Sequence, residues 1–461
     1  MSDQTDRWLV SFDTDRIKNY IFATNSLKEI RGASALLVEQ DGKREKPSEF
    51  SNLIYAGGGG GASFVDSQAD AEKLVRQIER DFREATKTAT ITAVALPPSV
   101  NEASSWFGRR MSDAGKELQR QKSRKGELGL LPVAPYMRLC DSCGYQPAER
   151  RLDGKIDPAG DLLCESCARK RERGKQMRWE EFEQGFVQDF RNFVEQPGKS
   201  KKWANAALPC DLNALGDLDE SGYVGFVIMD GNRMGKLLDL MAKPENYTEF
   251  SKNLADLLKN SVFKILEEGT KPVRKTLPFE IVLIGGDDVM LFTTASFAVP
   301  FALKVLQRFE HESQRLLEKA GLLQQDLIAR LREKFEADNM PIDENEPFYQ
   351  HRKLTMAAGV VICHPNFPIP ALVEIGETLL KNAKKKCAEI RMAGGKTVAY
   401  DQGTIDFQVV TGSAMELDMA RATVPHCRPY RLNEMAKLWE FARSLRELKI
   451  PRSQLQMVYD A

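Results

Sequence analysis

The sequence predicts an α+β protein made of two similar halves, a four-cysteine module between them and a helical carboxyl-terminal tail. Three observations support this prediction. Short β-branched runs alternate with helical periodicity in the same order in residues 1–105 and 216–403. Two Cys-x-x-Cys pairs lie between the halves, within residues 106–215. The remaining residues, 404–461, are expected to form the tail.

The first half opens with a predicted strand, Trp8–Phe12, that ends at Asp13. A helical pattern follows, and then two strand-like runs, Leu53–Ala56 and Ala62–Val65, flank the glycines Gly57–Gly61. No Gly-Lys-Ser/Thr follows these glycines, which argues against a P-loop. The first half therefore reads as strand, helix and hairpin, with glycines in the hairpin turn.

Two basic runs flank the cysteines in the middle region, from Arg109 to Lys125 and from Arg169 to Arg178. They could contact an RNA backbone. They could equally be solvated helix faces, because Asp113, Glu117 and Glu172 are interleaved with them. Both interpretations stay open on the sequence alone.

The spacing of Cys140, Cys143, Cys164 and Cys167 is typical of a structural zinc site, in which two knuckles share one tetrahedral Zn²⁺. Four thiolates complete the shell, so no catalytic position is expected there. This cysteine usage favours a reducing compartment over a disulfide framework. The other four cysteines are scattered: Cys210, Cys363, Cys387 and Cys427.

The second half repeats the plan of the first with acids in the turn. The predicted strand Tyr223–Met229 ends at Asp230, and the strands Glu280–Ile284 and Val289–Thr293 flank Gly285-Gly286-Asp287-Asp288. Further along, helical patterns are predicted for residues 301–337 and 370–390, and strands for Leu354–Ile362 and Thr397–Tyr400.

Carboxylates from adjacent strand ends can cage two divalent cations about 4 Å apart, the arrangement that phosphodiester synthesis from nucleoside triphosphates needs. Asp230, Asp287 and Asp288 are the candidate ligands, and Mg²⁺ prefers such oxygen ligands. The alternative is an ordinary polar turn, which the acid at the end of a separate strand disfavours. Glycines beside the acids would let a triphosphate approach the backbone: Gly231, Gly285 and Gly286.

Composition sets outer limits on function. The chain has 461 residues, of which 42% are hydrophobic and 29% charged, so a wholly disordered protein is excluded. The 66 basic and 66 acidic residues cancel, so any nucleic-acid contact must use a local patch. The polar start and the lack of a long apolar run predict a cytoplasmic protein with no membrane partner.

Several motifs carry a family resemblance. Met229–Lys236 and Ile284–Val289 resemble the palm domain of the large polymerase subunit of type III CRISPR-Cas effector complexes, the Cmr/Csm large subunit, with diguanylate cyclases as distant relatives. Asn19–Phe22 and Leu27–Ser34 resemble the opening of the same family's first palm. The resemblance implies two ferredoxin-like, nucleotide-cyclase-like palms with a zinc module between them, the first palm being degenerate.

The resemblance also implies a function in antiviral defence. The second palm would convert ATP into cyclic oligoadenylate messengers when foreign RNA is sensed, with Asp230 and Asp287 binding Mg²⁺ or Mn²⁺ and Asp288 as third carboxylate. Lys384 would bind the β and γ phosphates, although its lysine-rich segment could be a solvated helix face. Lys396 is a further nucleotide-binding candidate. Implied partners are ATP, guide or target RNA and other CRISPR effector subunits.

Two departures from the family limit this reading. None of the four histidines is followed by Asp, so the His-Asp nuclease activity common in the family is not expected. The chain is also short for the family, which leaves open whether it assembles with guide RNA or stands alone. Two other functions remain: a non-catalytic RNA-binding scaffold subunit, and a dinucleotide cyclase that uses GTP.

Overall fold

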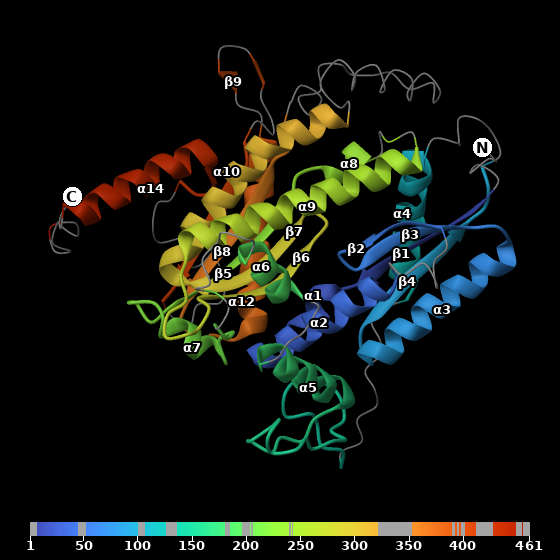
Figure 1. Cartoon of the computed structure of the whole chain (residues 1–461), viewed down its shortest axis with the longest axis horizontal. Coiled ribbons are helices and arrows are strands. Elements are labelled where there is room, and N and C mark those ends of the chain that lie inside the picture. The colour runs from blue at the N-terminus through green and yellow to red at the C-terminus, as the bar shows by residue number, and fades with distance from the viewer. Residues whose placement is uncertain are drawn as a thin grey trace.

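The fold of the chain is taken from a computed structural model, and Figure 1 shows two β-sheets that each carry helices. No helix in the described part of the chain has the length and apolar character needed to cross a membrane. The described residues are 7–44, 52–99, 107–125, 136–179, 185–195, 203, 206–238, 241, 243–320, 353–389, 392–393, 396–397, 402–411, 427–448 and 454.

The first palm is a four-stranded antiparallel sheet in the order β2-β3-β1-β4. This order and the alternation of elements make it ferredoxin-like, with β1 in the middle of the sheet. Consecutive residues of β1, Leu9 and Val10, point to opposite faces of the sheet, and both are fully buried because both faces are covered. Its elements are β1 (Trp8–Asp15), α1 (Ile17–Ile21), α2 (Leu27–Arg44), β2 (Leu53–Gly57), β3 (Gly60–Val65), α3 (Gln68–Thr86) and β4 (Thr90–Leu96).

The second palm repeats this plan and extends it, with the strand order β12-β11-β8-β5-β7-β6. Strand β5 takes the central place that β1 has in the first palm, between β7 and β8. The elements are β5 (Val224–Gly231), α8 (Met234–Leu238), α9 (Pro244–Gly269), β6 (Phe279–Gly285), β7 (Asp288–Thr294), α10 (Ala295–Lys319), β8 (Met356–Cys363), α12 (Ile369–Ala388), β11 (Thr404–Val410) and β12 (Tyr430–Arg431).

The remaining elements connect or flank the palms. They are α4 (Phe107–Arg124), α5 (Glu165–Trp179), α6 (Phe186–Val194), α7 (Leu212–Gly216), the two short strands β9 (Met392–Ala393) and β10 (Lys396–Thr397), and α14 (Leu432–Glu447). Helix α5 and the cysteine loops form a lobe at the lower edge of Figure 1.

The prediction of a helical tail over 404–461 is wrong for its first part. Residues Thr404–Val410 form β11, which pairs in parallel with β8 and belongs to the second palm sheet. Parallel neighbours need a crossover, and α12 supplies it. Helix α14 agrees with the prediction over Leu432–Glu447. The helix expected over 301–337 ends at Lys319, with Ala320 as its C-cap, and residues 321–337 lie outside the described residues.

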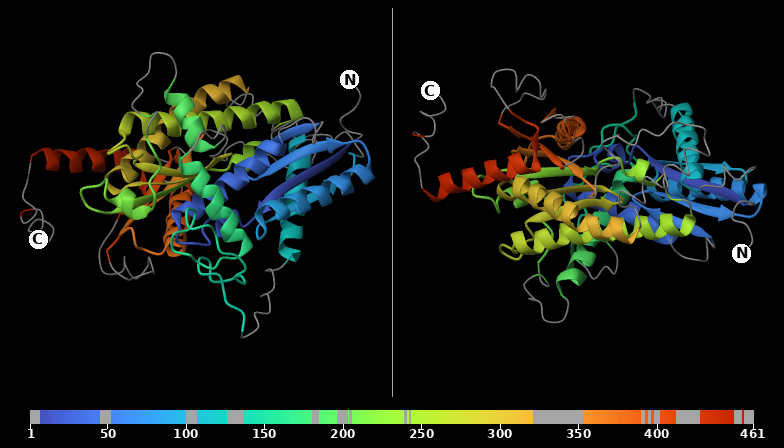
Figure 2. Two further views of the ribbon diagram at one scale, coloured as in Figure 1. Left: turned by 60° about the horizontal axis from the view of Figure 1, so that its bottom comes forward. Right: turned by 90° about the horizontal axis from the view of Figure 1, so that it is seen from above.

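The two palms pack against each other with approximate two-fold symmetry. Helix α2 of the first palm contacts β6 of the second, and α9 of the second contacts β2 of the first. Each of the two large apolar clusters contains residues from both palms, so the palms share their cores. Figure 2 shows the two sheets side by side from two further directions. Both palm hairpins are thereby placed at the interface.

A buried ion pair joins the palms and gives a first prediction. Arg31 on α2 donates from Nε to Oε1 of Glu280 on β6 at 2.9 Å, and the two side chains are 4% and 1% exposed. Replacing Arg31 with Met removes the guanidinium that pairs with a buried carboxylate, so we expect the free energy of unfolding, measured in urea, to fall by about 3–5 kcal/mol. The Arg31→Met, Glu280→Met double variant should recover most of this loss. An Arg31→Met loss no larger than that of exposed Lys116→Met would contradict the prediction.

Candidate functional site

The three predicted acids meet at the interface end of the second palm. Asp230 is the last but one residue of β5, Asp287 lies in the turn between β6 and β7, and Asp288 is the first residue of β7. Met229 pairs with Val289, so the end of β5 lies beside this turn. The Gly231 amide donates to the Asp287 carbonyl at 3.2 Å, which fixes the turn to the strand end.

Gly231 is required by close packing. A Cβ atom at this position would lie 2.6 Å from Oδ2 and 2.8 Å from Cβ of Asp287, so any other residue here would displace that acid. Gly286 has φ of 61°, the left-handed conformation that glycine adopts readily. The glycines next to the acids therefore permit the turn geometry itself, in addition to any room they leave for a ligand.

Burial and mutual repulsion disfavour the ionised forms of Asp287 and Asp288. Burial, followed by repulsion from Asp230, raises the pKa of Asp287 to about 6. Burial, followed by repulsion from Asp230 and Asp287, raises the pKa of Asp288 to about 7. A bound divalent cation would remove this repulsion, and carboxylate oxygens are the donors that Mg²⁺ and Mn²⁺ prefer.

Two lysines reach this site. Lys384 on α12 places Nζ 2.6 Å from Oδ2 of Asp230, so the predicted phosphate-binding lysine is brought to the acids. Lys18, from α1 of the first palm, pairs with Glu377 at 2.9 Å, and its charge opposes the rise in the pKa of Asp288. Lys396, by contrast, lies in β10, which pairs with β9 among the described strands.

A buried polar network holds the loop after Asp230, and the sequence analysis missed it. Asn232 donates from Nδ2 to Thr355 Oγ1 at 3.1 Å and to Cys387 Sγ at 3.2 Å. The Cys387 thiol donates to the Gln402 carbonyl at 3.1 Å. Cys387 lies three residues after Lys384 and hence on nearly the same helix face, a signal that was available in the sequence.

This network predicts a cost for removing the thiol. Cys387→Val keeps the volume but leaves the buried Asn232 amide and the Gln402 carbonyl each short of a partner, so we expect the free energy of unfolding to fall by about 1–2 kcal/mol. Cys363→Val is the matched control, because Cys363 is a buried thiol elsewhere in the same palm. Equal unfolding midpoints of the two variants in urea would show that the network contributes nothing.

The first palm repeats the backbone geometry of this site without its acids. Strand β1 continues two residues beyond Asp13, where the sequence predicted its end, and Asp13 lies opposite Gly60. The Thr14 amide donates to the Gly59 carbonyl at 3.0 Å, as Gly231 does to Asp287 in the second palm. Glycines thus occupy the positions of the two turn acids, as the sequence comparison of the halves indicates.

The residues after the two strand ends also correspond. Arg16 and Arg233, each three residues after the strand-end aspartate, share a left-handed backbone with φ of 47° and 58°. Lys122 on α4 lies 2.5 Å from Asp13, as Lys384 on α12 pairs with Asp230. In the first palm a lysine therefore neutralises the one remaining acid.

The glycine turn of the first palm packs directly against the acidic turn of the second. A Cβ atom on Gly285 would lie 2.7 Å from Cα of Gly58, so the two backbones touch. Asp41 on α2 accepts a hydrogen bond from the Gly59 amide at 3.0 Å, which holds the glycine turn in place. The degenerate palm thus buttresses the acidic turn.

The four cysteines form a metal-binding cluster. Their sulfur atoms all lie within 4.8 Å of one another, and among the described residues this is the one such group of His, Cys, Asp and Glu side chains. Gly144, with φ of 70°, completes the first knuckle, and its amide donates to the Cys140 carbonyl at 3.0 Å. Four thiols at this spacing fit a structural Zn²⁺.

The zinc module is fastened to the first palm through α2. Arg171 on α5, 8% exposed, forms ion pairs with Glu29 on α2 and with Asp157 and Asp161 of the module. Gly32 and Gly174 lie where α2 and α5 cross, and a Cβ atom on either would lie under 2 Å from the facing backbone. The helices are therefore in backbone contact.

The basic runs that flank the module are largely engaged within the chain. Lys170, 2% exposed, donates to the Tyr20 carbonyl and lies 3.8 Å from the centre of the Tyr20 ring. These partners indicate a structural role for many of the residues considered for RNA contact. Those that form ion pairs with acidic side chains include Lys116, Arg120, Lys122, Lys125, Arg169, Arg171 and Arg173.

Comparison with known proteins gives a family match. Residues 223–328 match the family model described as Cas10/Cmr2, second palm domain. No curated protein matches the chain. The family match covers β5 to α10, and so contains Asp230, Asp287 and Asp288.

Solved structures match over almost the whole chain. The Csm1-Csm4 cassette in complex with one ATP matches with a TM-score of 0.54 at 16% identity, covering 95% of this chain and 58% of that one. The Csm1-Csm4 cassette in complex with cA3 gives 0.53 at 15%, with coverages of 95% and 58%. Csm1 from T. onnurineus gives 0.52 at 16%, with coverages of 95% and 56%. The chain thus spans less than two thirds of these proteins; its fold is similar to theirs, and its residues 223–328 resemble the second palm domain of Cas10/Cmr2.

Proposed function

We propose that the second palm is a nucleotidyltransferase site that joins ATP into oligoadenylates, including cyclic ones, as messengers in antiviral defence. The observation that carries the proposal is the cluster of Asp230, Asp287 and Asp288, in which burial and mutual repulsion raise the pKa values of both turn acids. Such a cluster gains most from bound cations. The solved cassettes with one ATP and with cA3 support the choice of nucleotide and product.

Different residues of the second palm would bind the metal ions and the nucleotide phosphates. The three aspartates would hold Mg²⁺ or Mn²⁺, which when bound stabilises charge on the phosphates and activates the attacking hydroxyl. When a nucleotide binds, the Lys384 ammonium group would exchange its ion pair with Asp230 for one with the nucleotide phosphates, because carboxylate and phosphate are both anionic partners. Gly231, Gly285 and Gly286 would leave the backbone open to the triphosphate, and Lys396 would add a second cation.

The proposal also includes macromolecular partners. Guide or target RNA would regulate the site, and other CRISPR effector subunits would bind the chain, as Csm4 accompanies Csm1 in the matched cassettes. The four-cysteine module would hold a structural Zn²⁺ and take no part in the chemistry, because its four thiolates fill the metal shell.

The test is synthesis from each labelled nucleoside triphosphate with Mg²⁺ or Mn²⁺, with and without RNA. Oligomers from ATP that vanish in the Asp287→Ala, Asp288→Ala double variant would support the proposal. Products from GTP alone would replace it with a GTP-using dinucleotide cyclase. RNA binding without any product under all conditions would establish the non-catalytic scaffold function instead.

A further inference from the structure

Three of the four module cysteines line a cavity of about 410 Å³ between the first palm and the zinc module: Cys143, Cys164 and Cys167. The facing walls come from α1, from the end of α4 and from the start of β4. The shell around a metal site controls solvent access to the ligands, so this opening leaves the sulfur atoms of the cluster within reach of a dissolved molecule.

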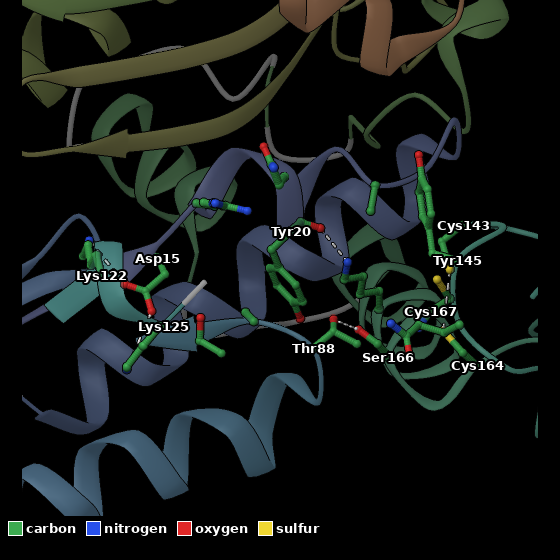
Figure 3. A pocket seen from close by; sticks show the side chains of 17 residues that line it. Asp15, Tyr20, Thr88, Lys122, Lys125, Cys143, Tyr145, Cys164, Ser166 and Cys167 are labelled. Carbon is green, nitrogen blue, oxygen red and sulfur yellow. Dashed lines mark hydrogen bonds and ion pairs between the residues drawn. The ribbon is translucent and has the colours of Figure 1, made fainter. Parts of the chain in front are cut away.

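The cavity opens to solvent beside the first cysteine pair. Tyr145, which lines it, is 74% exposed, and Asn19 on α1 is also an exposed lining residue. Cys143 is partly exposed, whereas the other three cysteines of the cluster are buried. Figure 3 shows Tyr145 and Cys143 at one end of the cavity, next to Cys164 and Cys167. A small solute can therefore reach the Cys143 sulfur while the module stays folded.

The accessible sulfur has a second sulfur beside it. Sγ of Cys143 lies 3.9 Å from Sγ of Cys164, and the two residues belong to different Cys-x-x-Cys pairs. A disulfide has a sulfur–sulfur distance of about 2.05 Å, so a movement of about 2 Å would close the bond. A cysteine that binds zinc does so as the thiolate, which is also the form that reacts with oxidants. The cluster therefore holds two thiolates in position to be joined.

We propose that the cluster is a site of reversible oxidation by a hydroperoxide, which joins Cys143 to Cys164. The Cys143 thiolate attacks one oxygen of hydrogen peroxide, the O–O bond breaks, and the products are a sulfenic acid and a hydroxide ion. The Cys164 thiolate then attacks the oxidised sulfur, so that a disulfide forms and a second hydroxide leaves. The two sulfurs lose two electrons to the peroxide, and solvent protonates both hydroxides to water.

The disulfide has a structural consequence for the first palm. It removes two of the four thiolates, so the module no longer retains its Zn²⁺. Helix α5 begins inside the cysteine cluster, and it carries Arg171, which pairs with Glu29 on α2. Oxidation of the module therefore loosens the contact between α5 and α2. The inference does not depend on the activity proposed for the second palm.

The test is treatment of the zinc-loaded full chain with hydrogen peroxide. A chromogenic chelator follows the released zinc, and mass spectrometry of peptides maps the disulfides. We expect loss of the zinc together with a Cys143–Cys164 disulfide, and dithiothreitol with added zinc should restore the zinc content. Disulfides within each Cys-x-x-Cys pair would overturn the proposal. Zinc that stays bound after the exposed Cys210 has been oxidised would overturn it too.

Two tyrosine variants test the cavity as the route of the oxidant. Tyr145→Ala widens the opening beside Cys143, so peroxide should release zinc several-fold faster than from the wild type. Tyr136→Ala is the matched control, because Tyr136 is a 90% exposed tyrosine of the module outside the cavity lining, and it should keep the wild-type rate. Both variants should melt as the wild type does, since both side chains are exposed. A wild-type rate in Tyr145→Ala would overturn the cavity as the route.

Discussion

Replacing Asp287 or Asp288 with Asn is expected to stabilise the metal-free protein while abolishing synthesis. Both acids have raised pKa values, about 6 and about 7, because burial and neighbouring carboxylates disfavour their ionised forms. At pH 8 both are ionised at a cost that an amide avoids. One pKa unit corresponds to about 1.4 kcal/mol, so we expect each variant to gain on the order of 2 kcal/mol in free energy of unfolding.

The stabilisation of each Asn variant should depend on pH. Between pH 4 and 7 the folded state holds protons that the unfolded state has released, so wild-type stability should fall as pH rises through this range. The gain of each Asn variant should therefore be large at pH 8 and absent near pH 4. Urea unfolding in a chelating buffer at both pH values measures it. A variant that is less stable than wild type at pH 8 would contradict the prediction.

A matched acid should respond in the opposite way. Burial opposes the ionisation of Asp219, but hydrogen bonds from Ser221 and Ser296 hold its pKa below the ordinary value. Asp219→Asn should therefore destabilise the protein at pH 8. In the synthesis assay, Asp287→Asn and Asp288→Asn should lose roughly a thousandfold in rate, because each removes a charge that would hold a metal. Asp219→Asn should keep its rate.

The sequence predicted the palms well because their signals are local. The strand that ends at Asp230 and the hairpin around Asp287 each follow from a short β-branched run with turn residues at its end. The four cysteines needed only their spacing. Lys384 was also predicted correctly to lie at the acids, but this prediction came from the family resemblance and not from the residue pattern.

What the sequence did not predict depends on contacts between distant segments. Residues Thr404–Val410 were predicted to belong to the helical tail, but they form β11, whose strand character comes from pairing with β8. The Asn232–Cys387 hydrogen bond joins residues that are 155 positions apart. The contact between Gly58 and Gly285 exists only because the palms pack face to face. Such contacts leave no periodic pattern in one sequence.

Removing zinc from the four-cysteine module is expected to unfold the module and loosen α2. The module's own apolar cluster is small, with six buried residues that include three of the cysteines, so the metal must supply much of its stability. Cys140→Ser should lower the zinc content from one ion per chain to nearly none, as measured by elemental analysis. Cys210→Ser, at an exposed cysteine outside the cluster, should keep one ion.

The loss of structure in the module should extend into α2, because side-chain contacts fix this helix to the module. Arg171 and the Gly32–Gly174 crossing fix α2 to the module, while Arg31 fixes the same helix to β6. Hydrogen exchange in Cys140→Ser should therefore speed up by at least a hundredfold in α5 and rise measurably in the first half of α2, since these segments lose their packing. Helix α14, which lies beyond the second palm, should exchange as in the wild type. Unchanged exchange in α5 after zinc is lost would mean that the protein contacts alone hold the module, and zinc would then be dispensable for its fold.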